Sequence, residues 1–316
     1  MGKISIVIPV YYNADTLMLL YEDMKEKILD QFPDYEIVMV DDGSGDESWE
    51  IMNQIREIDS HVQCVRLSRN FGEHAALLAG LSACTGDCAV TKQADLQEDS
   101  EIILDMYKSW EKGNKVVLAV RSDRDENAIK KFFANMYYII VRKFINKAMP
   151  AGGCDCYLLD RQVIKVLELL DEKNSSLTLQ VLWAGFRTDH VYFHRKDREI
   201  GKSRWTLGKK IKLAMDSMMS FSYFPIRFMS GVGVVFFILA CLMGIEVFVE
   251  KIIFGTPIAG WASIMCVMLF GFGIMMLMMG ILGEYVWRVL DASRNRPPYL
   301  IDEIRKSEEV QESDNK

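Results

Sequence analysis

The sequence predicts an α/β domain with a mostly parallel sheet, followed by a helical segment that enters a membrane. Over roughly the first 225 residues, short apolar runs alternate with segments of helical periodicity. This alternation is typical of a parallel sheet with helices on both faces. Two long apolar blocks follow, residues 228–249 and 258–283. The 26% of charged residues in the 316-residue chain therefore concentrate in its first part.

The alternation assigns the elements of the first part in order. Continuous apolar runs predict the strands, at residues 4–10, 36–40, 62–67, 89–91 and 116–121. Helical spacing of apolar residues predicts the helices between them, at residues 17–32, 48–58, 74–83 and 100–112.

Polar loops follow the first, second and fourth of these strands, at residues 9–13, 41–45 and 93–98. Ligands of parallel sheets bind at the carboxyl ends of the strands, so we expect these loops to form one crevice. Asp41, Asp42 and Asp95 lie in them. Carboxylates at strand ends accept hydrogen bonds from a base or ribose, and they bind the hard cations that neutralise a diphosphate. Taken alone, Asp-Gly-Ser is better explained as a turn with a helix cap.

Several classes of protein are excluded or disfavoured. No GxGxxG follows the first strand and no GxxxxGK[ST] is present, which argues against a Rossmann dinucleotide site and a P-loop. The net charge of −7 argues against nucleic acid as a partner. The apolar run at residues 4–10 is too short for a secretory signal, so we expect the first part to stay in the cytoplasm, with its seven cysteines reduced.

The two apolar blocks predict a membrane hairpin. About 20 residues span the hydrocarbon core, and the second block has 26 residues without a charge, while the first contains only Glu246. The eight residues 250–257 allow only a tight hairpin, so both chain ends should lie on the same side. Basic residues flank both outer ends, which predicts that these ends are cytoplasmic. They are Lys209, Lys210, Lys212 and Arg227 before the hairpin, and Arg288, Arg294 and Arg296 after it.

The segment before the first block, residues 206–224, alternates lysines with apolar residues. This pattern predicts an amphipathic helix in the headgroup layer, with an ordinary surface helix as the alternative. We expect a catalytic domain at 1–205, interfacial helices at 206–227, the membrane hairpin at 228–290 and a cytoplasmic tail at 291–316.

A series of short motifs extends along nearly the whole chain. They are Ile8-Pro9-Val10-Tyr11, Val40-Asp41-Asp42-Gly43-Ser44, Leu67-Ser68-Arg69-Asn70-Phe71-Gly72, Ala94-Asp95-Leu96-Gln97, Asp155-Cys156-Tyr157-Leu158-Leu159-Asp160-Arg161, Trp183-Ala184-Gly185-Phe186, Arg198-Glu199-Ile200-Gly201-Lys202-Ser203 and Phe221-Ser222-Tyr223-Phe224-Pro225. In this order they resemble the family 2 glycosyltransferases of the GT-A fold, in the branch that makes polyprenyl-phosphate sugars.

The resemblance implies the site residues and the ligands. The residues implied for the nucleotide sugar are Pro9, Tyr11, Asp41, Asp42, Gln93, Gln97 and Arg121. Asp95 would hold Mg²⁺ or Mn²⁺ on the diphosphate, Arg198 and Lys202 would face phosphates, and Asp155 would lie near the reacting phosphate. The implied partners are a UDP-sugar, undecaprenyl phosphate, the lipid bilayer and further copies of the chain in a tetramer.

This chain departs from the family pattern at three positions. Gln93 replaces the first carboxylate of Asp-x-Asp, Asn13 stands where an acidic residue is usual, and Tyr157 replaces an arginine. These departures indicate a changed sugar or a weaker metal site rather than lost activity, because the other site residues remain.

The function predicted from these features is inverting transfer of a hexose or N-acetylhexosamine from a UDP-sugar to undecaprenyl phosphate. One alternative is a catalytically silent membrane adaptor that binds nucleotide sugars, which the neutral Gln93 suggests. The other is a polysaccharide synthase, which should have a Gln-x-x-Arg-Trp segment and more spans.

Overall fold

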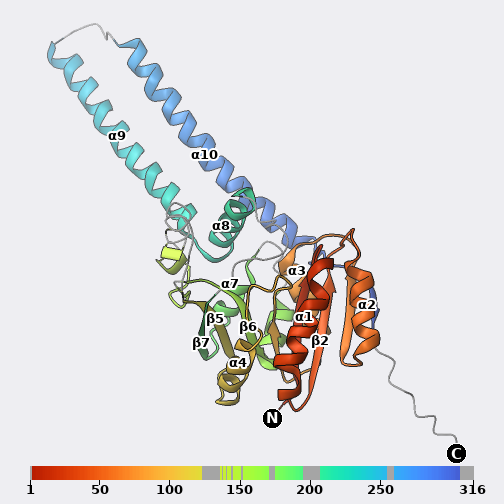
Figure 1. Cartoon of the computed structure of the whole chain (residues 1–316). Coiled ribbons are helices and arrows are strands. Elements are labelled where there is room, and N and C mark those ends of the chain that lie inside the picture. The colour runs from red at the N-terminus through yellow and green to blue at the C-terminus, as the bar shows by residue number, and fades with distance from the viewer. Residues whose placement is uncertain are drawn as a thin grey trace, which may run out of the picture. The chain divides into compact units, whose positions relative to one another are not determined.

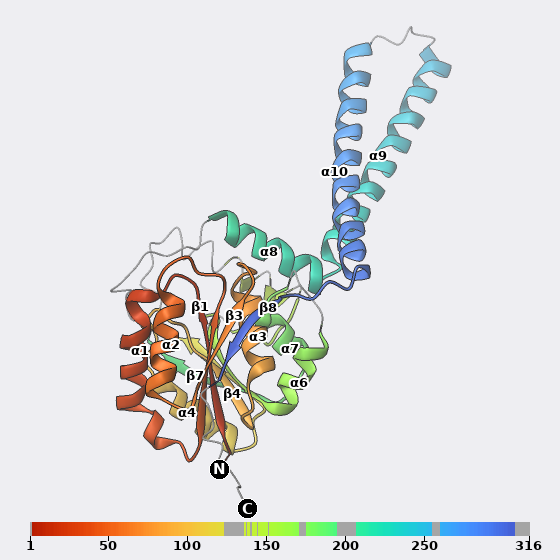
Figure 2. The ribbon, with the colours of Figure 1, turned by 90° about the vertical axis from the view of Figure 1, so that its right-hand side faces the viewer.

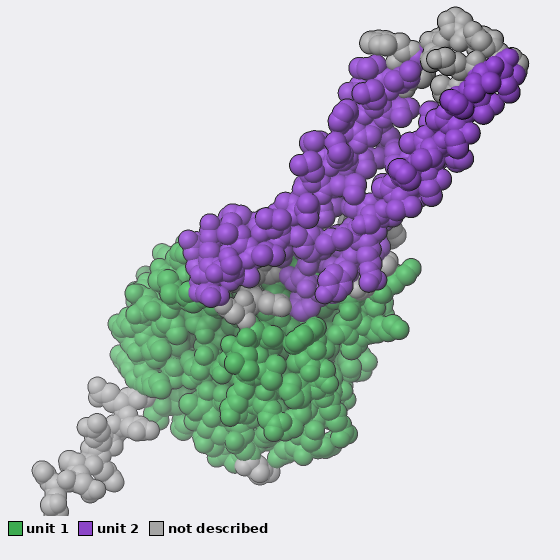
Figure 3. Space-filling view, turned by 180° about the vertical axis from the view of Figure 1, so that it is seen from behind, with its two compact units in different colours: residues 1–217, 297–316 green, residues 218–296 purple. Residues whose placement is uncertain are grey.

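The computed structural model describes residues 2–122, 136, 138–139, 141–143, 145–150, 152–170, 175–194, 207–254 and 260–306. The chain forms two compact units, which Figure 3 colours separately. One contains Met1–Ser217 together with Pro297–Lys316, and the other contains Met218–Arg296.

An eight-stranded sheet in the order β7-β5-β6-β4-β1-β2-β3-β8 forms the centre of the first unit (Figure 1). The parallel strands are β1 (Ile4–Val10), β2 (Tyr35–Asp41), β3 (Val62–Leu67), β4 (Cys88–Thr91), β5 (Val116–Arg121) and β7 (Thr188–Phe193). Of the strands in the described residues, only β6 (Cys154–Asp160) and the edge strand β8 (Ile301–Arg305) run antiparallel to these. The predicted mostly parallel sheet is confirmed.

Helices cover both faces of this sheet (Figure 2). One face packs against α1 (Ala14–Lys27), α2 (Ser48–Ile58) and α4 (Ile102–Glu111), and the other against α3 (Glu73–Ala83), α6 (Arg161–Leu169) and α7 (Leu177–Trp183). Alternate β1 residues such as Ile6 and Ile8 are buried under the first set of helices. On the other face α3 packs closely, since a Cβ on Gly80 would lie 2.3 Å from a methyl of Val7. The sheet is therefore buried on both sides, as its continuous apolar strands predict.

Several boundaries differ from those predicted. The helix expected at 17–32 ends at Lys27 and a 3₁₀ turn, Leu29–Gln31, follows it. The strands β6 and β8 and the helices α6 and α7 were not predicted, because β6 was interpreted only as a motif and β8 is short and half polar.

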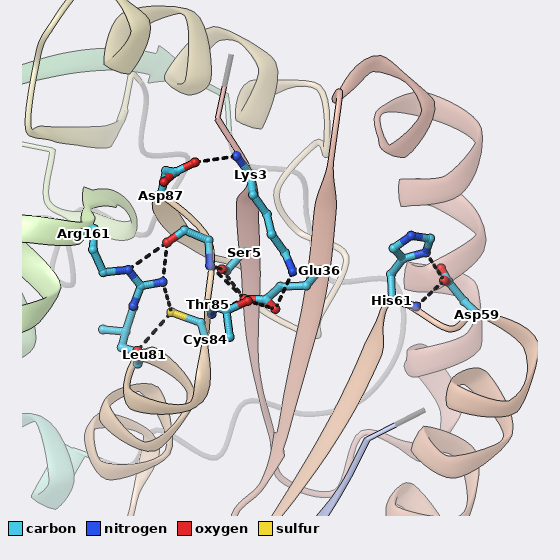
Figure 4. A network of polar contacts seen from close by, with 11 residues as sticks. Lys3, Ser5, Glu36, Asp59, His61, Leu81, Cys84, Thr85, Asp87 and Arg161 are labelled. Atoms are coloured by element: carbon cyan, nitrogen blue, oxygen red, sulfur yellow. Dashed lines mark hydrogen bonds and ion pairs between the residues drawn. The ribbon is translucent and has the colours of Figure 1, made fainter. Parts of the chain in front are cut away.

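The amino end of the sheet is tied together by Glu36 in β2 (Figure 4). Its carboxylate accepts hydrogen bonds from Ser5 Oγ at 2.6 Å, Thr85 Oγ1 at 2.7 Å and the Gly86 amide at 3.1 Å. Lys3 Nζ lies 3.2 Å from the same carboxylate. Glu36 thus joins β1, β2 and the turn before β4 at the end of the sheet opposite the predicted crevice.

Helix α8 (Leu207–Phe221) begins in the first unit, and the long helices α9 (Phe224–Phe254) and α10 (Trp261–Ser293) belong to the second. Segments Phe224–Glu246 and Val267–Ser293, with mean hydropathy 2.4 and 1.9, are long and apolar enough to span a bilayer. No side chain is buried in the most apolar stretch of either segment, and α9 contacts α10 where the Phe236 and Phe270 rings lie 5.4 Å apart.

The loop predicted between the two membrane segments, residues 250–257, begins too early in the chain. Glu250 and Lys251, expected in the loop, lie in α9, because the helix continues beyond the apolar block to Phe254. The side chains of the α8 lysines lie outside the described residues.

Candidate active site

The loops after β1, β2 and β4 lie together at the carboxyl end of the sheet. The Tyr12 amide donates to Ser44 Oγ at 3.0 Å, which joins the first two loops. Thr16 Oγ1 donates to the Ala94 carbonyl at 2.6 Å, which joins α1 to the third loop. The parallel pairing of β1 with both β2 and β4 brings these loops to one edge, as predicted.

Asp41 is the last residue of β2 and is fully buried. Its Oδ1 accepts the Ser44 amide at 2.9 Å, and its Oδ2 lies 3.5 Å from Arg66 Nε. Burial raises the pKa of the Asp41 carboxyl above its ordinary value, while the hydrogen bonds from Ser44 and the Arg66 guanidinium act in the opposite direction. Asp41 is therefore a carboxylate held in a fixed orientation with little solvation, suited to accept hydrogen bonds from a ligand.

Asp42 fixes the neighbouring loop that leads into α3. Its two oxygens accept the backbone amides of Phe71 at 2.7 Å and Gly72 at 2.9 Å. Gly72 has φ of 100°, a backbone conformation that residues with a side chain rarely adopt. Burial raises the pKa of Asp42, and these two amides oppose the shift. The position predicted for ligand contact thus also determines the shape of the crevice.

Aromatic rings follow β1 beside these carboxylates. The Tyr11 and Tyr12 rings pack edge to face with centroids 4.8 Å apart. Tyr12 is 40% exposed and has φ of 56°, a conformation uncommon for a residue with a side chain. Pro9 lies in β1 opposite Val40, one residue before Asp41. The loop therefore offers an aromatic surface next to Asp41.

The loop after β4 contains the departure from the family pattern. Gln93 Nε2 donates to Glu73 Oε1 at 2.7 Å, so a carboxylate from the first turn of α3 lies beside the neutral amide. Asp95 is half-buried and its Oδ1 accepts the Gln97 amide at 3.2 Å across Leu96, which has φ of 57°. Glu73 is not among the residues predicted for the site from the sequence, since its contact with Gln93 spans 20 residues.

Tyr157, another departure, is part of the buried core. Its hydroxyl lies 2.7 Å from Thr178 Oγ1, and its amide donates to Thr91 Oγ1 at 3.0 Å. Burial raises the pKa of Tyr157 well above the ordinary value. The neutral phenol therefore links β6 to α7, and the backbone amide of Tyr157 links β6 to β4. Arg121 ends β5 opposite Phe193 of β7.

Comparison with known proteins adds to this geometry. Residues 5–168 match the family model of glycosyl transferase family 2. The chain belongs to this family. The family resemblance and the fold expected from it are confirmed, and this glycosyltransferase is an enzyme by its class.

The glycosyltransferase is similar over nearly its full length to curated relatives. It is 35% identical to an uncharacterized glycosyltransferase, YkcC, of Bacillus subtilis (strain 168), over 94% of this chain and 92% of that one. It is 33% identical to a prophage bactoprenol glucosyl transferase homolog of Escherichia coli (strain K12), over 96% and 100%. It is also 33% identical to the bactoprenol glucosyl transferase of Shigella phage SfX, over 95% and 98%. A solved mannosyltransferase from Pyrobaculum calidifontis aligns with a TM-score of 0.49 and 16% identity, over 67% of this chain and 60% of that one.

Three of the predicted site residues of this glycosyltransferase remain predictions without a described side chain. Arg198 and Lys202 lie outside the described residues. Asp155 is the second residue of β6, but its side chain lies outside the described part. The described geometry therefore concerns the donor side of the site.

A divalent cation fits these residues only as a site shared with substrate. In the described part of the chain, no three His, Cys, Asp or Glu side chains group as metal ligands. Mg²⁺ is often bound by one or two carboxylates and the phosphates of the substrate. The half-buried Asp95 in its constrained loop suits such a shared site.

Proposed function

We propose that this glycosyltransferase moves a hexose or an N-acetylhexosamine from a UDP-sugar to undecaprenyl phosphate. The observation that supports this best is similarity along nearly the whole chain to proteins named bactoprenol glucosyl transferases, bactoprenol being undecaprenol. The apolar helices α9 and α10 give the protein access to a long lipid acceptor. The product is a lipid-linked sugar for modification of a cell-envelope glycan.

The donor nucleotide lies, in this proposal, against the loops after β1 and β2. The Asp41 carboxylate accepts hydrogen bonds from the base or ribose, and Pro9 and Tyr11 supply the adjoining apolar surface. The raised pKa of Asp41 supports this role, since a buried carboxylate gains from a donor group that replaces its lost solvation.

Asp95 and the donor diphosphate hold Mg²⁺ or Mn²⁺, with Gln93 and Gln97 in the same loop. When bound, the cation offsets the negative charge that develops on the leaving diphosphate. One protein carboxylate gives it little charge of its own, so we expect its affinity to depend on the nucleotide.

The reaction is a single displacement that inverts the anomeric carbon. An oxygen of the lipid phosphate forms the new bond to C1, and the bond from C1 to the diphosphate breaks, so that UDP leaves with the electron pair. Arg121, Arg198 and Lys202 balance the phosphate charges. The second pKa of a phosphate monoester is near 6, so the acceptor is largely ionised at neutral pH and Asp155 orients it rather than deprotonating it.

The catalytic unit faces the cytoplasm in this proposal. Strand β3 precedes the helical hairpin in the chain and β8 follows it, yet the two pair in one sheet. A hairpin whose flanking segments share a sheet has both ends on one side of the membrane. The basic residues that flank the hairpin favour the cytoplasmic side. We further propose, by the resemblance, that the protein is a homotetramer.

The test is transfer from a panel of labelled UDP- and GDP-sugars to undecaprenyl phosphate by the full-length protein in lipid vesicles. We expect one UDP-sugar to label the lipid and to release UDP in equal amount. Tight binding of a nucleotide sugar without any transfer would instead support the silent adaptor, which Gln93 suggests.

A further inference from the structure

The strand that follows the membrane hairpin forms the edge of the catalytic sheet next to β3 (Figure 2). Strand β8 pairs antiparallel with β3, and the Ser68 amide donates to the Leu300 carbonyl at 3.0 Å. Because β3 also pairs with β2, only one strand separates β8 from the strand that ends in Asp41. The tail of the chain thus reaches the immediate surroundings of the donor site.

Three charged residues occupy one line across these strands. In the register, Asp41 of β2 lies opposite Arg66 of β3, and Arg66 lies opposite Glu303 of β8. Residues opposite each other in a sheet project to the same face and interact. Arg66 Nε lies 3.5 Å from Asp41 Oδ2, and Glu303 Oε1 accepts Arg305 Nε at 2.5 Å. The charges along the line alternate in sign.

Helix α2 packs over these strands and contacts both Arg66 and Arg305. The Trp49 ring, 5% exposed, lies 5.3 Å from the Arg66 guanidinium and 5.4 Å from that of Arg305. Arg305 Nη1 also donates to Asn53 Oδ1 at 3.1 Å, one turn further along α2. Both guanidinium groups are therefore anchored on one aromatic ring, and a change in the position of Arg305 changes the packing of Arg66.

We propose that β8 is a positioning element of the nucleotide site, in which Glu303 and Arg305 hold Trp49 and Arg66, and Arg66 orients Asp41. This inference rests on the proposed role of Asp41 in binding the donor nucleotide. Donor affinity then depends on a strand that reaches the sheet only after the chain has passed through the membrane hairpin. None of these four positioning residues needs to touch the nucleotide.

A purely structural role would be protection of the sheet edge, because an unpaired edge strand is prone to aggregate. The two roles differ in what a mutation changes. Loss of edge protection lowers thermal stability at every pH. Loss of positioning changes nucleotide affinity and its dependence on pH, because the Arg66 guanidinium favours the ionised form of Asp41. The other charged groups that affect Asp41 are Asp42 and Asp46, and neither is changed in the test.

The experiment is calorimetry of UDP and of GDP with the full-length protein between pH 5 and 8. Two carboxylates of β8 provide a matched pair of variants, Glu303→Gln and Asp302→Asn, because Asp302 has no register partner in β3. We expect Arg305→Ala and Arg66→Gln to weaken binding of the preferred nucleotide by about fivefold or more. We expect Glu303→Gln to weaken it in the same direction, and Asp302→Asn to leave it unchanged.

The pH dependence identifies positioning. As the pH falls, nucleotide affinity should begin to drop at a higher pH in Arg66→Gln than in the parent. Arg66→Lys should restore the pH dependence of the parent. If Asp41→Asn weakens binding but the variants of β8 change only the melting temperature, positioning by β8 is wrong while the proposed function stands. If the parent binds neither nucleotide, the proposed function fails and this inference fails with it.

Discussion

Asp41 places a carboxyl group where water does not reach it, and burial raises its pKa although Ser44 and Arg66 oppose the shift. A carboxyl with a raised pKa is still protonated at pH values at which an ordinary aspartate, with a pKa of 3.8, is ionised. Only the ionised group accepts hydrogen bonds with both oxygens. Nucleotide affinity should therefore fall as the pH drops through the raised pKa of Asp41.

We predict that Asp41→Asn weakens UDP binding at pH 7.5 by about 10- to 100-fold, the range for a lost hydrogen bond to a charged group. In the parent, protonation of Asp41 lowers the nucleotide affinity as the pH falls. This part of the decrease should be missing in the variant. Calorimetry from pH 5 to 8 measures both effects. The matched control is Asp34→Asn, which removes an exposed carboxylate just before the opposite end of β2. Equal affinity in Asp41→Asn and parent would contradict the assignment.

Gln93 determines how much negative charge surrounds the predicted cation. Its amide donates to the Glu73 carboxylate, so Gln93→Asp would place a second carboxylate beside that of Glu73. We predict that this variant binds Mn²⁺ with UDP more tightly than the parent, because a hard cation relieves the repulsion between the two carboxylates. Gln93→Asn is the control, since it changes the side chain without adding charge. Unchanged Mn²⁺ affinity in Gln93→Asp would place residue 93 outside the metal environment.

At the scale of elements, the strands β1 to β5 were predictable because each is a continuous apolar run between polar loops. Their order in the chain also predicted the donor-side crevice. The strand β8 was not predictable, since apolar and polar residues alternate only weakly in Ile-Asp-Glu-Ile-Arg. Its pairing partner, β3, also lies far away in the sequence. The contact of Glu73 with Gln93 depends in the same way on tertiary packing, which no local pattern encodes.

Glu36 allows the packing of β1 and β2 to be tested apart from the active site (Figure 4). Burial opposes its ionisation, but hydrogen bonds from Ser5 and Thr85 and the charge of Lys3 lower its pKa below the ordinary 4.5. A carboxylate with a lowered pKa contributes stability above that ordinary value, and the contribution is lost as pH falls through the lowered pKa.

We predict that Glu36→Gln lowers the melting temperature at pH 7.5 by about 2–10 °C, from the loss of a charged acceptor. The difference from the parent should shrink as the pH falls below 4.5. Thermal unfolding in detergent at several pH values measures this. Glu26→Gln, which removes an exposed carboxylate of α1, should not change the melting temperature. A difference that stays constant at acid pH would show that the charge of Glu36 is not responsible.

At the scale of the molecule, the chain leaves the first unit after Ser217 and returns to it at Pro297. The apolar blocks predicted two spans from the sequence, but the return of the tail to the sheet came only from the structure. We predict that tags at both chain ends are protected from protease in intact spheroplasts and cleaved after lysis. Cleavage of either tag in intact cells would contradict the shared cytoplasmic side.

We propose that the phosphate of a polyprenyl lipid accepts the sugar. It is tested most directly by offering labelled donor to the full-length protein in vesicles that contain undecaprenyl phosphate, undecaprenol or neither. We expect label in the organic phase with undecaprenyl phosphate alone, and none with Asp95→Asn or in EDTA. Equal labelling of undecaprenol, or label that appears only in a water-soluble product, would contradict it.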